Sequence, residues 1–323
     1  MPLRRSVPER RAQKAALDRE IKEGRHAVLI VNTRSRSGAR IYSEAKRLLA
    51  ESGIALDAAY PIRYPERMVE IVREEIAKGR KFIIVGGGDG SISSVIGEFA
   101  YTDVVFGLLP LGTANSFART LGIPLDIAGA IDVLVNGKVA DIDLAMIGDA
   151  YFANGSSIGM PAIVGRATPH NLKRLIGRGA YAFVAAGKFV RYAPFGCTVT
   201  INGKKTTFKA FDVRIVNGGF QGGVLVDSDA SPDDGRIAIH ILRGPSKWAL
   251  AREWARLALG VPFGPADIEI LTASELTIDT VPKQHVAVDG EVITQTPIRV
   301  SVAREALLLM APTDLPQLED QEP

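Results

Sequence analysis

The chain has 323 residues, of which 46% are hydrophobic and 23% are charged, with a formal net charge of +3. This length allows one large hydrophobic core or two moderate ones, and we expect two. The charge is too small for a protein dedicated to nucleic acid, so we expect no nucleic-acid partner. The single cysteine, Cys197, excludes an internal disulfide framework and fits a reducing, cytoplasmic location.

Residues 1–25 are predicted to form a basic N-terminal arm. They contain eight Lys or Arg against four acidic residues, and they lack the apolar segment of a secretory signal. We interpret the arm as a solvated helix, with a weak attraction to anionic lipid as the alternative. The longest uncharged run, 150–165, contains polar residues and is shorter than the about 20 apolar residues that span a membrane.

From His26 onward, strand-like and helix-like segments alternate. Their periodicity predicts strands at 26–31, 54–60, 81–85 and 104–109, and helices at 41–49, 66–78, 112–121 and 127–134. This order is typical of a parallel sheet that helices cover on both faces. The sequence therefore predicts an α/β domain over 26–138.

The pattern changes near residues 136–138 to short strands separated by Gly, Asn and Asp turns. Strands are predicted at 151–153, 197–201, 208–216, 237–242, 276–278, 286–288 and 298–302, with Asn202-Gly203 as a hairpin signal. Helices are predicted at 171–192 and 247–259. We expect an antiparallel β domain over 139–303, a buried strand at 306–310 that returns to a core, and a disordered acidic tail over 314–323.

Three loops of the α/β domain have the composition of anion-binding turns. VGGGDGS (85–91) joins a predicted strand to a helix, and PLGTANSF (110–117) and NTRSRSG (32–38) follow two other strands. Free amides and the helix dipole favour phosphate at such turns, and ligands of open parallel sheets gather at this edge. VGGGDGS lacks both the Rossmann glycine spacing and the lysine of a P-loop, so a tight turn without a ligand is the alternative.

Two acidic turns lie in the predicted β domain. DSDASPDDG (227–235) offers clustered carboxylates that suit Mg²⁺, although such turns are usually exposed and need no ligand. The other turn, VDGE (288–291), has the Asp-Gly pair of a hairpin, and by itself it favours that interpretation.

In the order GGGDGS, PLGTANSFARTLGIP, ANGSSIGM, SPDDGR and VDGE, these segments together resemble the diacylglycerol kinase catalytic family. That family includes bacterial lipid kinases and the sphingosine and ceramide kinases. The resemblance runs from about residue 27 to 312. It implies an α/β plus β fold: an N-terminal parallel-sheet nucleotide-binding domain resembling NAD kinases, and a C-terminal antiparallel β-sandwich domain that carries part of the active site. It also implies that a terminal strand, 304–313, returns to the first domain.

The resemblance assigns roles to individual residues. Asp289 and Glu291 match the family's DGE turn, in which the Asp is the candidate base facing the lipid hydroxyl. Asp233, Asp234 and the carbonyl of Arg236 match a structural metal turn. The ATP-binding residues implied are Asn32, Gly38, Gly87, Gly88, Asp89, Gly90, Ser91, Gly112, Thr113 and Asn115.

Three positions depart from the family pattern. Ser91 replaces the usual Thr and keeps its hydroxyl, whereas Ser94 and Ser116 stand where many members have Glu and Asp. The two missing carboxylates put the metal-coordination network in doubt. Asp89 raises a separate question, because a carboxylate repels phosphate. It could act through Mg²⁺, water or a ribose hydroxyl, or it could cap the helix that follows it.

The implied activity is ATP- and Mg²⁺-dependent transfer of the γ-phosphoryl group to a lipid hydroxyl, with diacylglycerol as the default acceptor. Sphingoid bases or ceramide, a soluble NAD-kinase-like activity and a catalytically weakened nucleotide sensor are the alternatives. The segment 166–191 has six Lys or Arg and no acid, so it suits either a peripheral membrane surface or a helix packed on the β domain. The oligomeric state stays open, with a homodimer as one option.

Overall fold

The computed structural model describes residues 6–34, 38–64, 66–160, 192–221, 223–225, 231–243, 248–258, 268–289 and 291–316. The chain divides into two compact units. The first contains Met1–Leu144, Pro232–Asp234 and Ala303–Pro323, and the second contains Ala145–Ser231 and Gly235–Val302. The first division follows Leu144, where the sequence predicted a change after 138.

The first unit contains the predicted parallel sheet. Its strand order is β2 (Ala55–Ile62), β1 (His26–Asn32), β3 (Phe82–Gly87), β4 (Val105–Pro110) and the C-terminal part of β18 (Ile298–Ala311). Every residue of β3 and β4 is buried, as expected for a sheet with both faces covered. Leu309 pairs with Phe106 in parallel, so the predicted strand at 306–310 does return to this sheet.

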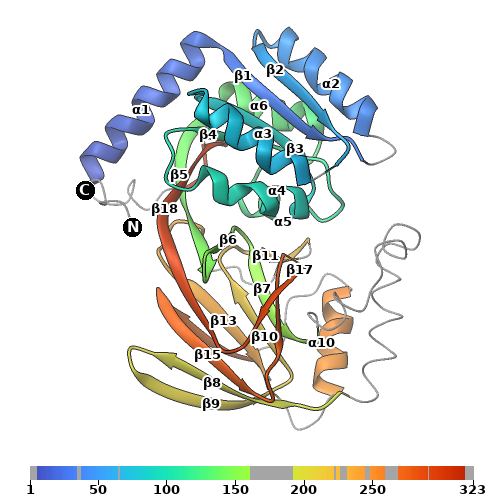
Figure 1. Cartoon of the computed structure of the whole chain (residues 1–323), viewed down its shortest axis with the longest axis vertical. Helices are drawn as coiled ribbons and strands as arrows, with labels where there is room; N and C mark the ends of the chain where they lie inside the picture. Colours follow the sequence, from blue (N-terminus) through green and yellow to red (C-terminus); the bar gives the residue numbers. More distant parts are fainter. Residues whose placement is uncertain are drawn as a thin grey trace. The chain divides into compact units, whose positions relative to one another are not determined.

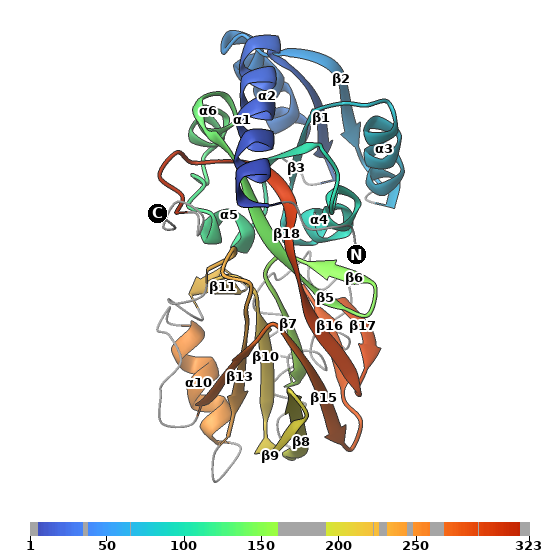
Figure 2. The ribbon, with the colours of Figure 1, turned by 90° about the vertical axis from the view of Figure 1, so that its left-hand side faces the viewer.

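Helices cover the two faces of this sheet. α2 (Gly38–Glu51) packs with α6 (Ile127–Asn136), and α3 (Glu66–Ala77) packs with α4 (Asp89–Ile96), on opposite sides of the sheet (Figure 2). A short 3-10 helix, η1 (Gly97–Phe99), follows α4. The helix predicted at 112–121 is shorter than expected, because only α5 (Ser116–Thr120) is helical and the preceding residues form a loop.

The N-terminal helix α1 (Val7–Gly24) is not a solvated arm. Leu17 and Ile21 are each 6% exposed, and Lys14 on the same face places its Nζ 2.6 Å from Oδ1 of Asp141. Arg10 forms an ion pair with Glu305. The prediction of a solvated helix was wrong because it rested on the overall basic composition. One face of the helix, at positions 14, 17 and 21, is buried and packs on β5 (Lys138–Ile147) and β18.

The second unit is built from antiparallel strands in two sheets (Figure 1). One sheet contains the N-terminal part of β18, followed by β15 (Glu275–Val281), β8 (Phe195–Ile201) and β9 (Lys204–Ala210). The other has the order β14 (Ile268–Ala273), β13 (Ile237–Leu242), β10 (Asp212–Val216), β7 (Gly155–Gly159), β16 (His285–Val288) and β17 (Glu291–Gln295). Apolar side chains from both sheets form one core, among them Ile239, Ile278 and Val300. This arrangement confirms the predicted β-sandwich.

The strand predictions of the second unit hold in part. The hairpin at Asn202-Gly203 is confirmed, since both residues have positive φ. The segment predicted as one strand at 208–216 is two strands that break at Phe211, whereas 298–302 and 306–310 belong to the single strand β18. Strands β5, β7, β14 and β17 were missed, as were two short strands at Phe220–Gln221 and Val224–Leu225. β7 (GSSIG) has little strand propensity and forms because β10 and β16 pair with it on both sides.

Three smaller elements complete the described chain. β6 (Ala150–Phe152) pairs with β5, and β11 (Phe220–Gln221) pairs with β12 (Val224–Leu225). The helix predicted at 247–259 is α10 (Trp248–Ala258). The basic helix predicted at 171–192 lies outside the described residues apart from Tyr192. No helix in the described ranges is long and apolar enough to cross a membrane.

Candidate active site

Three glycine- and polar-rich loops of the first unit follow neighbouring parallel strands, and we number them in chain order as the first (32–38), second (85–91) and third (110–117) loops. Hydrogen bonds join the first loop to the second and the second to the third. Asn32, the last residue of β1, donates from Nδ2 to Oγ of Ser91 over 2.8 Å. The amide of Leu111, which follows β4, donates to the carbonyl of Gly87 at the end of β3, over 2.9 Å. The structure therefore brings together the loops that the sequence predicted to bind ATP.

Several of the glycines in these loops allow neighbouring backbone or side-chain atoms to approach closely. A Cβ added to Gly112 would lie 2.6 Å from Cα of Gly88, and one added to Gly87 would lie 2.6 Å from Cβ of Ser91. Gly38 meets the backbone of Thr33 at the same distance. Gly90 differs, because a Cβ there would meet nothing within 4 Å. Gly90 therefore borders open space, which is what a ligand cradle requires.

Asp89 does not cap its own helix, so that hypothesis is wrong. It is the first residue of α4, whose N-cap is Gly88. Its Oδ1 instead accepts from the amide of Phe117, over 3.3 Å, at the start of α5. Burial raises the pKa of Asp89, while the amides of Phe117, Ser116 and Asn115 oppose that shift. The carboxylate thus joins the second loop to the third.

Asn115 uses its side chain to close the third loop. It has a φ of 47°, its Oδ1 accepts from the Gly112 amide (2.8 Å), and its Nδ2 donates to the Gly112 carbonyl (3.0 Å). The left-handed region favours Asn among residues with a Cβ. Asn115 is buried and Thr113 is exposed. Of these two predicted ATP-binding residues, Thr113 is the one with an accessible side chain.

The two serines that replace family acids occupy different environments. Ser94 is exposed, and its hydroxyl donates to the Ser91 carbonyl over 2.8 Å. Ser116 is only 3% exposed. A carboxylate at 116 would therefore stand in a buried position beside Asp89, which already accepts from amides of that helix.

The VDGE segment forms the hairpin between β16 and β17, as its Asp-Gly pair predicted. Asp289 has a φ of 45°, and its amide donates to the Gly155 carbonyl over 3.1 Å. Glu291 begins β17 and is exposed, and Gly290 lies outside the described residues. The hairpin therefore holds the backbone of Asp289 against the start of β7.

Sequence reasoning did not single out Asn154 as a site residue. It precedes Gly155, which binds the Asp289 amide, and it is 4% exposed. Its Oδ1 is buried without a hydrogen-bond partner, and a buried polar atom in that state calls for an explanation. The sequence feature that could have identified Asn154 was its position in the ANGSSIGM segment, one of the motifs that carry the family resemblance.

The acidic turn at 232–234 is anchored to the first unit. The Pro232 carbonyl accepts from the Asp143 amide over 2.7 Å, and Arg304 donates to the Asp234 carbonyl over 3.5 Å. Arg236 belongs to the second unit and is exposed, and 226–230 lie outside the described residues. Within the described ranges, no three His, Cys, Asp or Glu side chains gather as metal ligands. The metal turn therefore stays a prediction.

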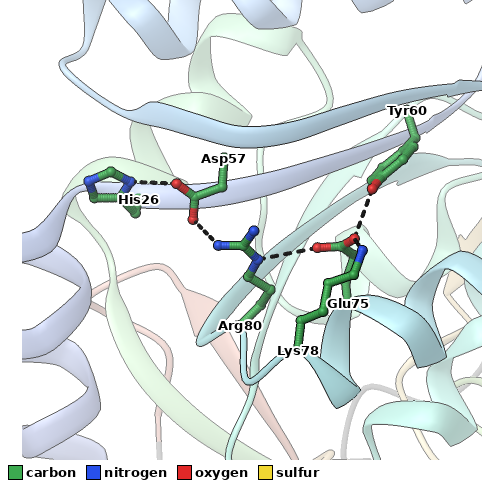
Figure 3. Close-up of polar contacts among 6 residues, drawn as sticks. All are labelled: His26, Asp57, Tyr60, Glu75, Lys78 and Arg80. Carbon is green, nitrogen blue, oxygen red and sulfur yellow. Dashed lines mark hydrogen bonds and ion pairs between the residues drawn. The ribbon is translucent and has the colours of Figure 1, made fainter.

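A separate polar network joins side chains of β1, β2, α3 and the segment between α3 and β3 (Figure 3). Asp57 binds Nδ1 of His26 (2.7 Å) and the guanidinium of Arg80 (2.7 Å). Glu75, 1% exposed, accepts from Arg80 and Tyr60 and pairs with Lys78. The network borders a cavity of about 270 Å³. Since Asp57 and Glu75 already have cationic partners, we assign the network to stability.

A family model described as "Diacylglycerol kinase catalytic domain" matches residues 26–147, and one described as "YegS C-terminal NAD kinase beta sandwich-like domain" matches 155–311. Helix α1 precedes both matches.

Individual relatives agree with the family models. A "probable lipid kinase YegS-like" of Pseudomonas putida is 30% identical over 301 residues, 92% of this chain and 98% of that protein. A "diacylglycerol kinase" of Bacillus subtilis is 28% identical over 246 residues, 74% of this chain and 80% of that protein. The crystal structure of a diacylglycerol kinase from Bacillus anthracis superimposes with a TM-score of 0.70 at 21% identity, covering 90% of this chain and 98% of that one.

Proposed function

Because this chain belongs to the lipid kinase family that carries the diacylglycerol kinase catalytic domain, we propose that it transfers the γ-phosphoryl group of ATP to a lipid hydroxyl. Diacylglycerol is the first acceptor to test. The observation that carries the proposal is the set of three loops that hydrogen bonds join in series, in which Gly90 borders open space.

The start of α4 supplies the main argument for nucleotide binding. The Gly90 amide donates to no acceptor within the described part of the chain, and it stands in the first turn of an eight-residue helix. Free amides at a helix start favour an anion. We assign the triphosphate to this turn, with the exposed Thr113 hydroxyl as a further donor. When bound, ATP supplies the phosphoryl group and Mg²⁺ neutralises charge on the phosphates.

Ser91 has a defined role in this proposal. Its hydroxyl accepts from Asn32, so its own hydrogen is available to donate to a phosphate oxygen. Asn32 thereby orients Ser91 and acts as a positioning residue. Asp233, Asp234 and the Arg236 carbonyl are the groups of this chain that would hold a structural Mg²⁺, because oxygen ligands suit that ion.

Asp289 is the proposed proton acceptor. A primary alcohol is a much weaker acid than a carboxylic acid, so full deprotonation before reaction is unfavourable. The carboxylate instead orients the hydroxyl and accepts its proton as the bond to phosphorus forms. The bond from the Asp289 amide to Gly155 holds the turn in place for this role. Glu291, next but one along the hairpin, is the second candidate carboxylate.

The test compares Asp289→Asn with the native protein, using radiolabelled ATP and a panel of diacylglycerol, ceramide, sphingosine and NAD. Asn also tolerates the positive φ of this turn, so the hairpin is expected to persist. We expect loss of phosphoryl transfer with ATP binding retained. Near-normal turnover by this variant would refute the base assignment. Glu291→Gln tests the second candidate carboxylate: its loss of turnover, with near-normal turnover of Asp289→Asn, would assign the base to Glu291 instead.

One observation favours a second candidate, a nucleotide sensor with weakened catalysis. Ser94 and Ser116 leave the loops without two carboxylates that many family members have, and Ser116 is buried. This candidate predicts ATP binding with no labelled product from any acceptor of the panel. Labelled NAD would instead identify the soluble NAD-kinase-like activity.

A further inference from the structure

Helix α1 lies outside the family match, which begins at residue 26, and charged contacts fix it to the first unit. Lys14 pairs with Asp141 of β5 over 2.6 Å, and Arg10 pairs with Glu305 of β18. The side chains of Arg10 and Glu305 are 12% and 17% exposed, so salt screens this pair only weakly. The N-terminal half of α1 therefore contacts β5 and β18 together.

Glu305 connects this contact to the acidic turn. Its backbone has a φ of 54°, a left-handed conformation that residues with a Cβ rarely adopt. The amide of Glu305 donates to Oδ1 of Asp143 over 2.7 Å, and the amide of Asp143 donates to the carbonyl of Pro232 over 2.7 Å. A path of direct contacts thus runs from Arg10 to the residue that precedes Asp233.

A second contact reaches the same turn from the neighbouring residue of β18. Arg304 donates to the carbonyl of Asp234 over 3.5 Å. The turn is therefore held at Pro232 through Asp143 and at Asp234 through Arg304. Since Arg304 and Glu305 are adjacent, the backbone of β18 at this point decides where the turn lies. All of these residues belong to the first unit.

We propose that Arg10 is a positioning residue for Mg²⁺ at the acidic turn. A left-handed residue with a Cβ keeps its conformation only while its surroundings hold it, and the ion pair with Arg10 is one of the contacts that hold Glu305. Without that pair, relaxation of Glu305 moves its amide away from Asp143 and loosens the turn. A loose turn binds a cation less tightly, because part of the binding energy is spent on ordering it. The choice of Mg²⁺ rests on the proposed function, which assigns the turn as a metal site.

Calorimetric titration of the nucleotide-free protein with Mg²⁺ measures this coupling. Coupled sites commonly change an affinity by about 5- to 150-fold, and we expect Arg10→Met to weaken Mg²⁺ binding about tenfold. Arg10→Lys keeps a cation near Glu305 and should recover part of the affinity. Gln13→Ala is the matched control, because it breaks a different contact of α1, from Nε2 of Gln13 to Oδ1 of Asp103 over 2.6 Å. It should bind Mg²⁺ like the native protein.

A double variant, Asp233→Asn with Asp234→Asn, shows whether the titrated site is the acidic turn. We expect it to abolish the binding seen with the native protein. If it does, and Arg10→Met binds Mg²⁺ as tightly as the native protein, the positioning role of Arg10 is overturned. Mg²⁺ binding that survives in the double variant, or no binding by the native protein, would overturn the metal turn and this inference with it.

A reverse effect on α1 provides a test that does not depend on the folding of an Arg10 variant. By linkage, an ion that binds more tightly when α1 is docked must favour the docked helix by the same factor. Saturating Mg²⁺ should therefore slow hydrogen exchange of the α1 amides about tenfold in the native protein and leave it unchanged in the double variant. Identical exchange of the native protein with and without Mg²⁺ would contradict the coupling.

Neither measurement uses phosphoryl transfer, so the inference and the kinase activity are tested separately. If the native protein phosphorylates no acceptor and Arg10→Met still weakens Mg²⁺ binding, the kinase proposal fails and the positioning role of Arg10 stands. If the native protein is an active kinase and Arg10→Met leaves both Mg²⁺ affinity and α1 exchange unaffected by the ion, the positioning role alone fails.

Discussion

The carboxylate of Asp89 accepts a hydrogen bond from the amide of Phe117, with 3.3 Å between Oδ1 and N. Asp89 opens α4 and Phe117 belongs to α5, so the bond connects two of the three loops proposed to bind ATP. Asn32 connects the remaining loop through Ser91. A change in one of these side chains should therefore alter the geometry of a neighbouring loop.

Replacement of Asp89 should affect ATP binding through the third loop. Asp89→Ala removes the acceptor at the start of α5, and we expect a loss of about 1–2 kcal/mol in stability, as for helix caps, with a raised KM for ATP. Asp89→Asn keeps one acceptor oxygen and should lose less. Urea unfolding and initial rates provide the two measurements. Equal stability of Asp89→Ala and the native protein would contradict the bond's structural role.

Two glycines of the second loop form a matched pair. Gly90→Ala places a methyl group in open space inside a helix, so stability should be retained or rise by about 0.5–1 kcal/mol, while ATP affinity falls because the methyl group occupies the proposed phosphate position. Gly87→Ala meets Cβ of Ser91 at 2.6 Å and should lower both stability and affinity. Calorimetric titration with ATP and thermal unfolding test the pair. Unchanged ATP affinity in Gly90→Ala would remove phosphate from this turn.

The pH dependence of stability should carry a contribution from Asp212. This residue is buried, Arg214 Nε lies 3.3 Å from its Oδ2, and its Oδ1 has no hydrogen-bond partner. Burial, partly offset by Arg214, raises the pKa of Asp212 from 3.8 to about 6. The folded state thus binds the proton more tightly than the unfolded state. This difference stabilises the folded state below pH 4, and the stabilisation is lost as the pH rises through 6. The free energy of unfolding should fall by about 3 kcal/mol in total.

Urea unfolding of native protein and Asp212→Asn across pH 4 to 8 measures this effect. The variant also removes the partner of Arg214, but that cost does not depend on pH in this range. The comparison is therefore between the two proteins' slopes of unfolding free energy against pH. We expect the native protein to lose about 3 kcal/mol relative to the variant between the two limits. Parallel profiles would show that Asp212 ionises normally in the folded state.

The ion pair between Lys14 and Asp141 should make α1 necessary for stability. Both side chains are at most 10% exposed, and Lys14→Met leaves a buried carboxylate without its nearest cation. Breaking a buried pair in this way costs about 3–5 kcal/mol. Lys22→Met is the control on the same helix, because Lys22 is 40% exposed and its pair with Asp18 should contribute less than about 1 kcal/mol. Equal unfolding midpoints for the two variants would contradict the assignment.

The sequence alone determined the elements whose signals are local. The continuous apolar runs of β1, β3 and β4 identified buried parallel strands, and Asn202-Gly203 identified a hairpin from its tolerance of positive φ. The order of the loop motifs also indicated the family, because glycine and hydroxyl residues at strand ends are visible without coordinates. Each strand, hairpin and motif depends on neighbours within a few positions along the chain, and the family is indicated by the order of several such motifs.

Only the tertiary structure decided which distant groups satisfy one another. Asp89 caps α5 from 28 residues away, and the burial of Lys14 depends on Asp141, 127 residues further along the chain. β7 is a strand because β10 and β16 pair with it, although its glycine- and serine-rich sequence has little strand propensity. Hydrogen bonds and ion pairs between remote residues leave no periodic pattern in a sequence, since their partners are chosen by how the chain packs.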